Sequence, residues 1–162
     1  MPMRFRKLIP FFVLLWTGII CSPGMIFAQQ ISHTYDSLAS KVLKLINDHR
    51  TEMALKPLVM VKQITSAASV HSLNMATGKV PFGHKGFDER MDHLKDKLKP
   101  VNSFAENVAF GASTADEVVD LWLTSPGHRQ NIEGDFDLTG IGIVKSKDGD
   151  LYYTQIFLRK GN

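Results

Sequence analysis

Cysteine is almost absent from the sequence: the single one, Cys21, lies in an N-terminal leader, and residues 29–162 have none. This absence excludes disulfide bonds and thiolate metal ligands from those residues, even in an oxidising compartment. They must therefore fold on a hydrophobic core alone. Removing 28 of the 162 residues leaves 134, a length at which one domain buries about two-thirds of its unfolded surface. With no internal repeat and no low-complexity tract, we expect one domain over 29–162.

An excess of one charge sign is also missing once the leader is set apart. The whole chain has 19 Lys and Arg against 16 Asp and Glu, and Arg4, Arg6 and Lys7 lie in the leader. The remaining 16 basic residues balance the 16 acidic ones. The sequence pI near 9.0 therefore reflects the leader, and we expect neither nucleic acid nor an anionic membrane as a partner.

The apolar stretch from Leu8 to Cys21 is shorter than the ~20 residues that a membrane-spanning helix needs. It follows the basic residues and precedes Ile26-Phe27-Ala28, which ends in a small residue suited to cleavage. This order is typical of a secretory signal peptide. We predict a signal peptide over 1–28, no membrane span after its removal, and a secreted or periplasmic location. An uncleaved anchor is the alternative, because the apolar character continues as far as Phe27.

Helical spacing of apolar residues predicts one helix over 34–54 and a second that ends near Thr77-Gly78. Between the second and a third predicted helix, residues 79–86 are rich in Gly and Pro, so they form a loop that presents His84. The third helix covers 87–97. Its many charges permit i,i+4 pairing, which is typical of a solvated face.

The second half of the chain changes from helix to strand patterns. Residues 104–110 predict a strand, and Thr114 with Glu117 forms a capping-box pattern at the start of a helix that runs through Trp122. From Asp137 onward apolar residues alternate, with a turn at Asp148-Gly149, which predicts a β-hairpin. We expect an α+β domain of helices packed on a small antiparallel sheet.

Several motifs occur in an order that resembles the CAP (SCP-like) superfamily of cysteine-rich secretory proteins, insect antigen 5 and plant pathogenesis-related proteins, in its bacterial form. The resemblance covers nearly all of residues 29–162 and implies an α-β-α sandwich. The motifs are Asn47-Asp48-His49-Arg50 followed by Lys56-Pro57-Leu58, His71-Ser72-Leu73-Asn74-Met75, Gly83-His84-Lys85-Gly86-Phe87 with Glu89-Arg90-Met91, Ala105-Glu106-Asn107-Val108-Ala109, Trp122-Leu123-Thr124-Ser125-Pro126-Gly127-His128-Arg129-Gln130-Asn131-Ile132 and Tyr152-Tyr153-Thr154-Gln155-Ile156-Phe157.

The resemblance also implies a central cleft lined by two histidines and two acidic residues. Three of these places fall on His84, Glu106 and His128, and the fourth falls on Ser125, where the animal-type pattern has an acid. We expect Glu106 at the start of an inner strand, within reach of both histidines. Loss of the fourth acid weakens the case for tight metal binding and for a pair of carboxylates acting as acid and base.

The cleft residues leave three hypotheses of function open. The first is a non-catalytic binding module for a lipid, peptide or cell-envelope ligand. The second is a metal-dependent hydrolase, since zinc accepts imidazole and carboxylate ligands such as His84, His128 and Glu106. The third is an interaction domain whose polar pocket only braces the fold. A serine hydrolase with Ser125 as nucleophile is disfavoured, because Ser125 is in no nucleophile-elbow context.

Two further residues have structural interpretations. His71 shares the apolar face of the second helix with Ala68 and Met75, so we expect a core histidine with its hydrogen bonds satisfied. Arg50 is expected to be a structural ion-pair partner. No pattern indicates an oligomeric state.

Overall fold

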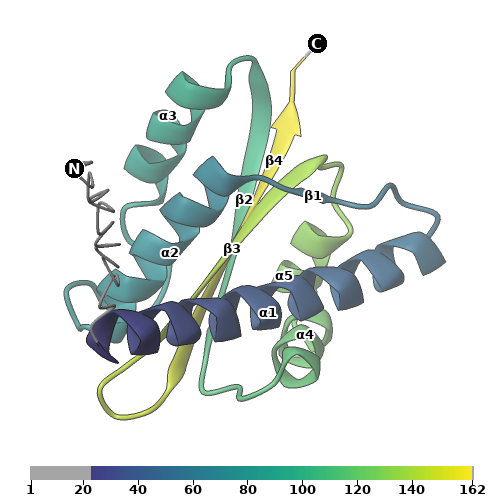
Figure 1. Ribbon diagram of the computed structural model, residues 1–162. Helices are drawn as coiled ribbons and strands as arrows, with labels where there is room; N and C mark the ends of the chain where they lie inside the picture. The colour runs from purple at the N-terminus through teal and green to yellow at the C-terminus, as the bar shows by residue number, and fades with distance from the viewer. Residues whose placement is uncertain (1–22, 162) are drawn as a thin grey trace, which may run out of the picture.

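The computed structural model describes residues 23–161, with side chains from residue 35 onward. Five helices and four strands make up this part of the chain (Figure 1). In order they are α1 (Pro23–Glu52), β1 (Val59–Met60), α2 (Lys62–Ala76), α3 (Phe87–Leu98), β2 (Val101–Phe110), α4 (Ala115–Thr124), α5 (Pro126–Ile132), β3 (Leu138–Lys145) and β4 (Leu151–Lys160).

The four strands form a mixed sheet in the order β1-β3-β4-β2. The predicted hairpin of β3 and β4 is confirmed, and β2 pairs antiparallel with β4. The short β1 pairs parallel with β3, so the sheet is not purely antiparallel. The expected place of Glu106 was wrong in detail: it lies in the middle of β2, which is an edge strand.

Helices cover both faces of this sheet, which confirms the α+β class. Along β4, Tyr153 and Phe157 pack in one core cluster with α1 and α4, whereas Ile156 and Leu158 pack in a second cluster with α2 and α3. Successive strand residues point to opposite faces, so this alternation separates the two layers of helices. Figure 1 shows α2 and α3 lying together on one side of the strands. The architecture is an α-β-α sandwich.

Two glycines of β3 allow α2 to lie directly on the sheet. A Cβ atom on Gly140 would overlap the backbone nitrogen of Thr65, and one on Gly142 would overlap that of Ser69. Real Cβ atoms do not approach backbone atoms so closely, so both positions require glycine. This contact fixes the height of α2 above β3 and β4, and with it the position of the residues that α2 contributes to the site.

The predicted cap of α4 is confirmed, while α5 was not predicted. Thr114 accepts from the backbone N–H of Glu117, and the Glu117 carboxylate accepts in return from the N–H of Thr114. Sequence reasoning treated Pro126-Gly127 as an interruption, yet α5 begins at Pro126. Proline is well suited to the first turn of a helix because its missing N–H has no partner there.

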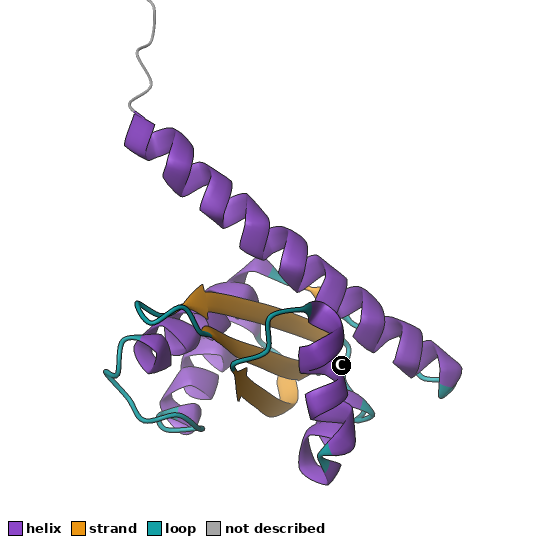
Figure 2. Ribbon diagram, turned by 90° about the horizontal axis from the view of Figure 1, so that it is seen from below, coloured by secondary structure: helices purple, strands orange, loops and turns teal. Residues whose placement is uncertain are grey.

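The first helix is longer than predicted and begins at Pro23 (Figure 2). Residues 1–22 of the predicted signal peptide lie outside the described residues, and the cleavage point after Ala28 falls in the first turns of α1. Cleavage therefore stays a prediction. Within the described residues no helix is both long and apolar enough to cross a bilayer.

Arg50, near the end of α1, does not form the expected ion pair. It is 2% exposed, and its guanidinium donates to backbone carbonyls, among them those of Lys56, Ile132 and Gly134. Burial lowers its pKa, against the attraction of Asp135 and Asp137. A five-donor guanidinium suits this arrangement because several carbonyls of one loop can accept from it. Arg50 thus ties the loop before β3 to α1.

Candidate functional site

Glu106 is the centre of the candidate site. Its side chain is 1% exposed, and it lies opposite Ile156 of β4 in the sheet register, so it points to the face covered by α2 and α3. Arg90 of α3 holds it at two points: Nε and Nη2 donate to Oε2 at 3.0 and 2.7 Å, and Nη2 also donates to Oε1 at 2.8 Å. Such two-point pairing neutralises a buried carboxylate.

His84 joins the same carboxylate from the loop between α2 and α3. Its Nδ1 lies 3.0 Å from Oε1 of Glu106. A carboxylate oxygen only accepts, so Nδ1 carries a hydrogen and Nε2 is the ring nitrogen left for another partner. The loop reaches this position through Gly83 and Gly86, whose φ angles are +132° and +76°. The His84 side chain is 50% exposed, so it is the part of the site that meets solvent.

His71 of α2 is a third partner that sequence reasoning did not place in the site. The prediction of a core histidine is confirmed, since the side chain is 1% exposed and Nε2 donates to the carbonyl of Gly83 at 2.8 Å. The same Nε2 is 3.8 Å from Oε1 of Glu106. Burial lowers the pKa of His71, although the carbonyl and Glu106 act in the opposite direction. His71 therefore supports the loop of His84 as a neutral donor.

The other face of β2 carries the second half of the site. Asn107 follows Glu106, so its side chain points to the opposite face of the sheet. Its amide donates to the backbone carbonyl of His128 on α5 at 3.1 Å. Asn131, also on α5, donates to Oδ1 of Asn107 at 2.8 Å and to the carbonyl of Glu106 at 3.3 Å. These bonds place α5 at the free edge of β2.

His128 lies within electrostatic range of His84. Its pKa is lowered, first by burial and second by the charge of His84. Among the described residues no hydrogen bond joins the ring of His128 to Glu106. The structure therefore brings His84 directly to Glu106, and brings His128 near His84 from the other side of the edge strand.

Ser125 separates α4 from α5 and has an extended backbone, with φ −91° and ψ 118°. Within the described part of the chain its hydroxyl forms no hydrogen bond with His84, His128 or Glu106. A serine nucleophile needs a base within hydrogen-bond reach. The geometry gives no support to the serine hydrolase that sequence reasoning already disfavoured.

The three-ligand metal site of His84, His128 and Glu106 does not fit this donor set. Both oxygens of Glu106 accept from Arg90, so a metal ion would have to displace a guanidinium that is itself a cation. Among the described residues no cluster of three His, Cys, Asp or Glu side chains has the geometry of a metal site. Glu106 instead orients His84 from behind, as carboxylates orient histidines in many sites.

Arg90 is the main residue to which sequence reasoning gave no role in the site, although Glu89-Arg90-Met91 is among the motifs that carry the resemblance. It stands among the charges of the third helix, and these were interpreted together as a solvated face. The available signal was the position of Arg90, about one helical turn after Gly86, the last glycine of the loop that carries His84. A side chain at that position can reach back to the loop. Its side chain also donates to the carbonyls of Lys85 and Gly86.

A profile of the family described as CAP, cysteine-rich secretory protein family, matches residues 43–157. Among curated proteins the chain is 34% identical over 123 residues to uncharacterized protein YkwD of Bacillus subtilis (strain 168), covering 74% of this chain and 46% of YkwD. It is 24% identical over 149 residues to uncharacterized membrane protein YlbC of the same organism, covering 90% of this chain and 41% of YlbC. The chain spans less than half the length of these two relatives.

Solved structures show the same fold. An extracellular protein containing an SCP domain from Bacillus anthracis str. Ames has a TM-score of 0.66 and 27% identity, over 77% of this chain and 41% of that one. An outer surface protein from Borrelia burgdorferi has a TM-score of 0.64 and 21% identity, over 74% of this chain and 90% of that one. The second likeness concerns the fold alone.

Proposed function

The chain belongs to the cysteine-rich secretory protein (CAP) family, and from this premise we propose that it is an exported binding module of bacterial type whose cleft is formed by His84, Glu106 and His128. Two observations support export. The sequence of residues 1–28 has the order of a signal peptide, and the structural relative that is 27% identical is an extracellular protein.

The observation that favours binding over catalysis is the state of Glu106. A general base needs a free lone pair near the substrate, and a metal ligand needs an uncommitted oxygen. Arg90 occupies both oxygens, and the carboxylate is 1% exposed. Glu106 therefore acts as a fixed negative charge that orients His84, not as a reacting group.

In the proposed cleft a ligand would meet two imidazoles of different character. His84 is half exposed and presents Nε2, while His128 is partly buried with a lowered pKa. A neutral imidazole both donates and accepts hydrogen bonds. Such a pair suits a polar group of a lipid, peptide or cell-envelope molecule. In this proposal Ser125, at the junction of α4 and α5, would contribute a hydroxyl beside His128.

The first experiment concerns export. Protein recovered from the periplasm or the medium of an expressing cell is analysed by N-terminal sequencing, and we expect Gln29 at or near the N-terminus. Met1 on membrane-bound protein would identify an uncleaved anchor and overturn the secreted assignment.

The second experiment concerns the cleft and uses the exported protein without an added His tag. Imidazole resonances are followed by NMR while a lipid extract, soluble peptidoglycan fragments and envelope peptides are added separately. We expect one fraction to shift the signals of His84 and His128 but not those of His49, which lies on α1 beside Glu133 and lines neither the cleft nor a pocket with these residues. If no fraction shifts either signal, the cleft only braces the fold.

Zinc titration and turnover assays distinguish the proposed binding module from a metal-dependent hydrolase. A bound metal stabilises the folded state by about 2.7 kcal/mol at one hundred times its Kd, and we expect at most micromolar affinity from two imidazoles. Fluorogenic peptides and p-nitrophenyl esters should not be hydrolysed. Turnover that is lost in His84→Ala or His128→Ala but is unchanged in His93→Ala would establish a hydrolase instead.

A further inference from the structure

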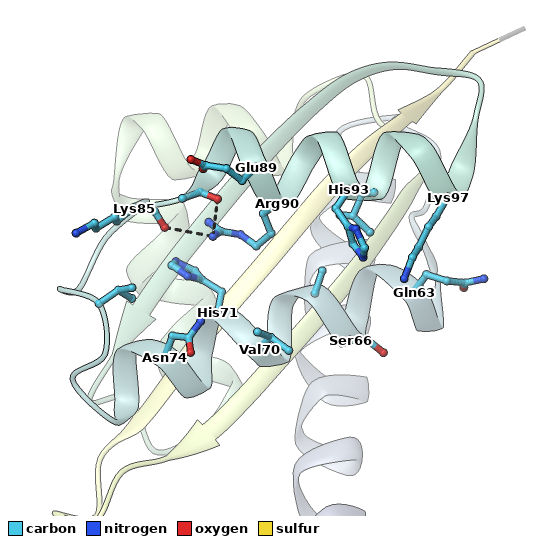
Figure 3. A pocket seen from close by; sticks show the side chains of 14 residues that line it. Gln63, Ser66, Val70, His71, Asn74, Lys85, Glu89, Arg90, His93 and Lys97 are labelled. Atoms are coloured by element: carbon cyan, nitrogen blue, oxygen red, sulfur yellow. Dashed lines mark hydrogen bonds between the residues drawn. The ribbon is translucent and has the colours of Figure 1, made fainter.

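A groove of about 690 Å³ lies between α2 and α3 (Figure 3). It is separate from the exposed side of His84, which does not line it. Arg90 and His71 form its inner end, where both residues also approach Glu106. The groove therefore begins behind the candidate cleft and continues along the two helices toward Lys97.

The α3 wall of the groove carries basic side chains, because most of the basic residues of α3 lie on a different face of the helix from its aspartates. Arg90, His93 and Lys97 recur at helical spacing and line the groove. Three acidic residues one helical turn apart are exposed and do not line the groove: Asp88, Asp92 and Asp96. The charges that sequence reasoning interpreted as one solvated face are thus divided between solvent and groove.

Two lysines line the groove, one at each end. Arg90 is neutralised by Glu106, whereas Lys85 and Lys97 form no ion pair within the described residues. The one acidic residue of the lining is Glu89. In Figure 3 its carboxylate and the Lys85 ammonium both point away from the α2 wall, whereas Lys97 extends toward that wall. Lys97 is therefore the unpaired cation that faces the groove.

The α2 wall is apolar in the middle and carries amides at its ends. Ala67 and Val70 face Leu94 of α3 across the groove, and Val70 is 57% exposed. Gln63 and Asn74 lie at the two ends of this wall. Eleven residues of helix separate them, which is about 16 Å at 1.5 Å per residue. Amide side chains both donate and accept, as peptide groups do.

We propose that this groove binds a short, extended, acidic peptide segment. About five residues of extended chain span 16 Å at ~3.3 Å per residue, which matches the distance between the two amides. Alternate side chains of such a segment would reach the apolar middle and Lys97. A fatty acyl chain fits less well, because it offers no hydrogen bonds to Gln63 and Asn74.

The test uses fluorescein-labelled, N-acetylated pentapeptide pools with the exported protein. One pool has Asp or Glu at positions one, three and five and Val or Leu between them, and the control pool has Asn or Gln in place of the acids. Fluorescence anisotropy measures binding at low and at physiological salt. We expect the acidic pool to bind, with an affinity that falls as salt rises, and the neutral pool to bind at least tenfold more weakly.

Substitutions locate the binding. Lys97→Glu reverses the charge of a residue that lines the groove, and it should lower the affinity for the acidic pool by about tenfold. Lys95→Glu reverses an exposed charge of α3 outside the groove and should change the affinity less than twofold. Val70→Asp, at an exposed position, should weaken binding as Lys97→Glu does. Circular dichroism shows that each variant is folded.

His84→Ala separates this inference from the function proposed for the cleft, since it should leave peptide affinity unchanged. The inference is overturned if neither pool binds, if both bind equally, or if Lys95→Glu weakens binding as much as Lys97→Glu. Loss of binding in His84→Ala, with Lys97→Glu unaffected, would place the peptide in the cleft. Displacement of the acidic pool by dodecanoate at equal concentration would identify an acyl chain as the occupant.

Discussion

Arg90 and Glu106 form a two-point ion pair that joins α3 to the middle of the edge strand, with both carboxylate oxygens within 2.8 Å of Nη2. The arginine side chain is 13% exposed and the glutamate 1%. The pair therefore lies where removal of one partner leaves an uncompensated charge. It is also the contact that commits Glu106 to orienting His84.

Arg90→Met should lower the free energy of unfolding by about 3–5 kcal/mol, the usual effect of leaving one buried charge unpaired. Urea denaturation measures the change. Arg129→Met is the matched control, because Arg129 is exposed on α5, and it should change stability by less than about 0.5 kcal/mol. The double variant Arg90→Met with Glu106→Gln should recover part of the loss. A loss under about 1 kcal/mol in the single variant would show that Glu106 is solvated.

Gly142→Ala should destabilise the protein by about 3 kcal/mol or more, because the new Cβ would meet backbone atoms of α2 and push the helix off the sheet. Thermal unfolding checks this. Gly127→Ala is the control, since beyond its chain neighbours and the backbone of its own helix no described atom lies within 4 Å of the place that its methyl group would take in α5, and alanine favours helix. Equal stability of the two variants would mean that α2 lies farther from β3 than the structure shows.

Tyr153 should make the free energy of unfolding depend on pH in the alkaline range. Its hydroxyl donates to the carbonyl of Ala112 at 2.9 Å, and burial, with the charge of Glu117 second, raises its pKa to about 12. A raised pKa favours the neutral form in the folded state, so its stabilisation is present below the unfolded pKa of ~10 and is lost as pH rises toward 12. The loss amounts to roughly 2–3 kcal/mol.

Tyr153→Phe should remove this alkaline slope and cost about 1 kcal/mol at neutral pH, because the carbonyl of Ala112 loses its donor. Unfolding free energies at pH 8, 10 and 11 compare the variant with the parent. Tyr35→Phe serves as a control at a partly exposed tyrosine. An alkaline slope that persists in Tyr153→Phe would show that other groups cause it.

Thr114→Ala removes the hydroxyl of the capping box and should cost about 1 kcal/mol. Chemical denaturation gives the value. Thr124→Ala, on the same helix, is the comparison: its hydroxyl donates to carbonyls within α4 and is exposed, so the expected cost is near zero. If both substitutions cost the same, the cap adds no stability beyond a surface threonine.

Local patterns predicted most of the elements because their signals are local. The capping box at Thr114, the turn at Gly149 and the glycine loop before α3 each specify a backbone conformation within a few residues. The parallel pairing of β1 with β3 depends on residues far apart in sequence, and two strand residues carry no periodicity. That pairing could not be predicted for this reason.

The candidate site was predictable only in part, for a similar reason. Resemblance indicated His84, Glu106 and His128, and the structure places His84 on Glu106 at 3.0 Å. The pairing of Glu106 with Arg90 depends on the tertiary position of α3, which the charge spacing of that helix does not reveal. His71 shows the same limit: its apolar neighbours correctly predicted burial, but its distance from Glu106 depends on how closely α2 approaches the sheet.

The outer edge of β2 is closed by side chains instead of by another strand. The carbonyl of Val108 accepts from Nε1 of Trp122 at 3.2 Å, and that of Glu106 accepts from Asn131. An exposed strand edge is a template for aggregation, because its free carbonyls and amides can pair with a second chain. A chain that pairs with β2 here would first have to break bonds to a buried indole and an amide. The side chains that join α4 and α5 to β2 therefore also occupy two edge carbonyls that edge-to-edge pairing with a second chain would need.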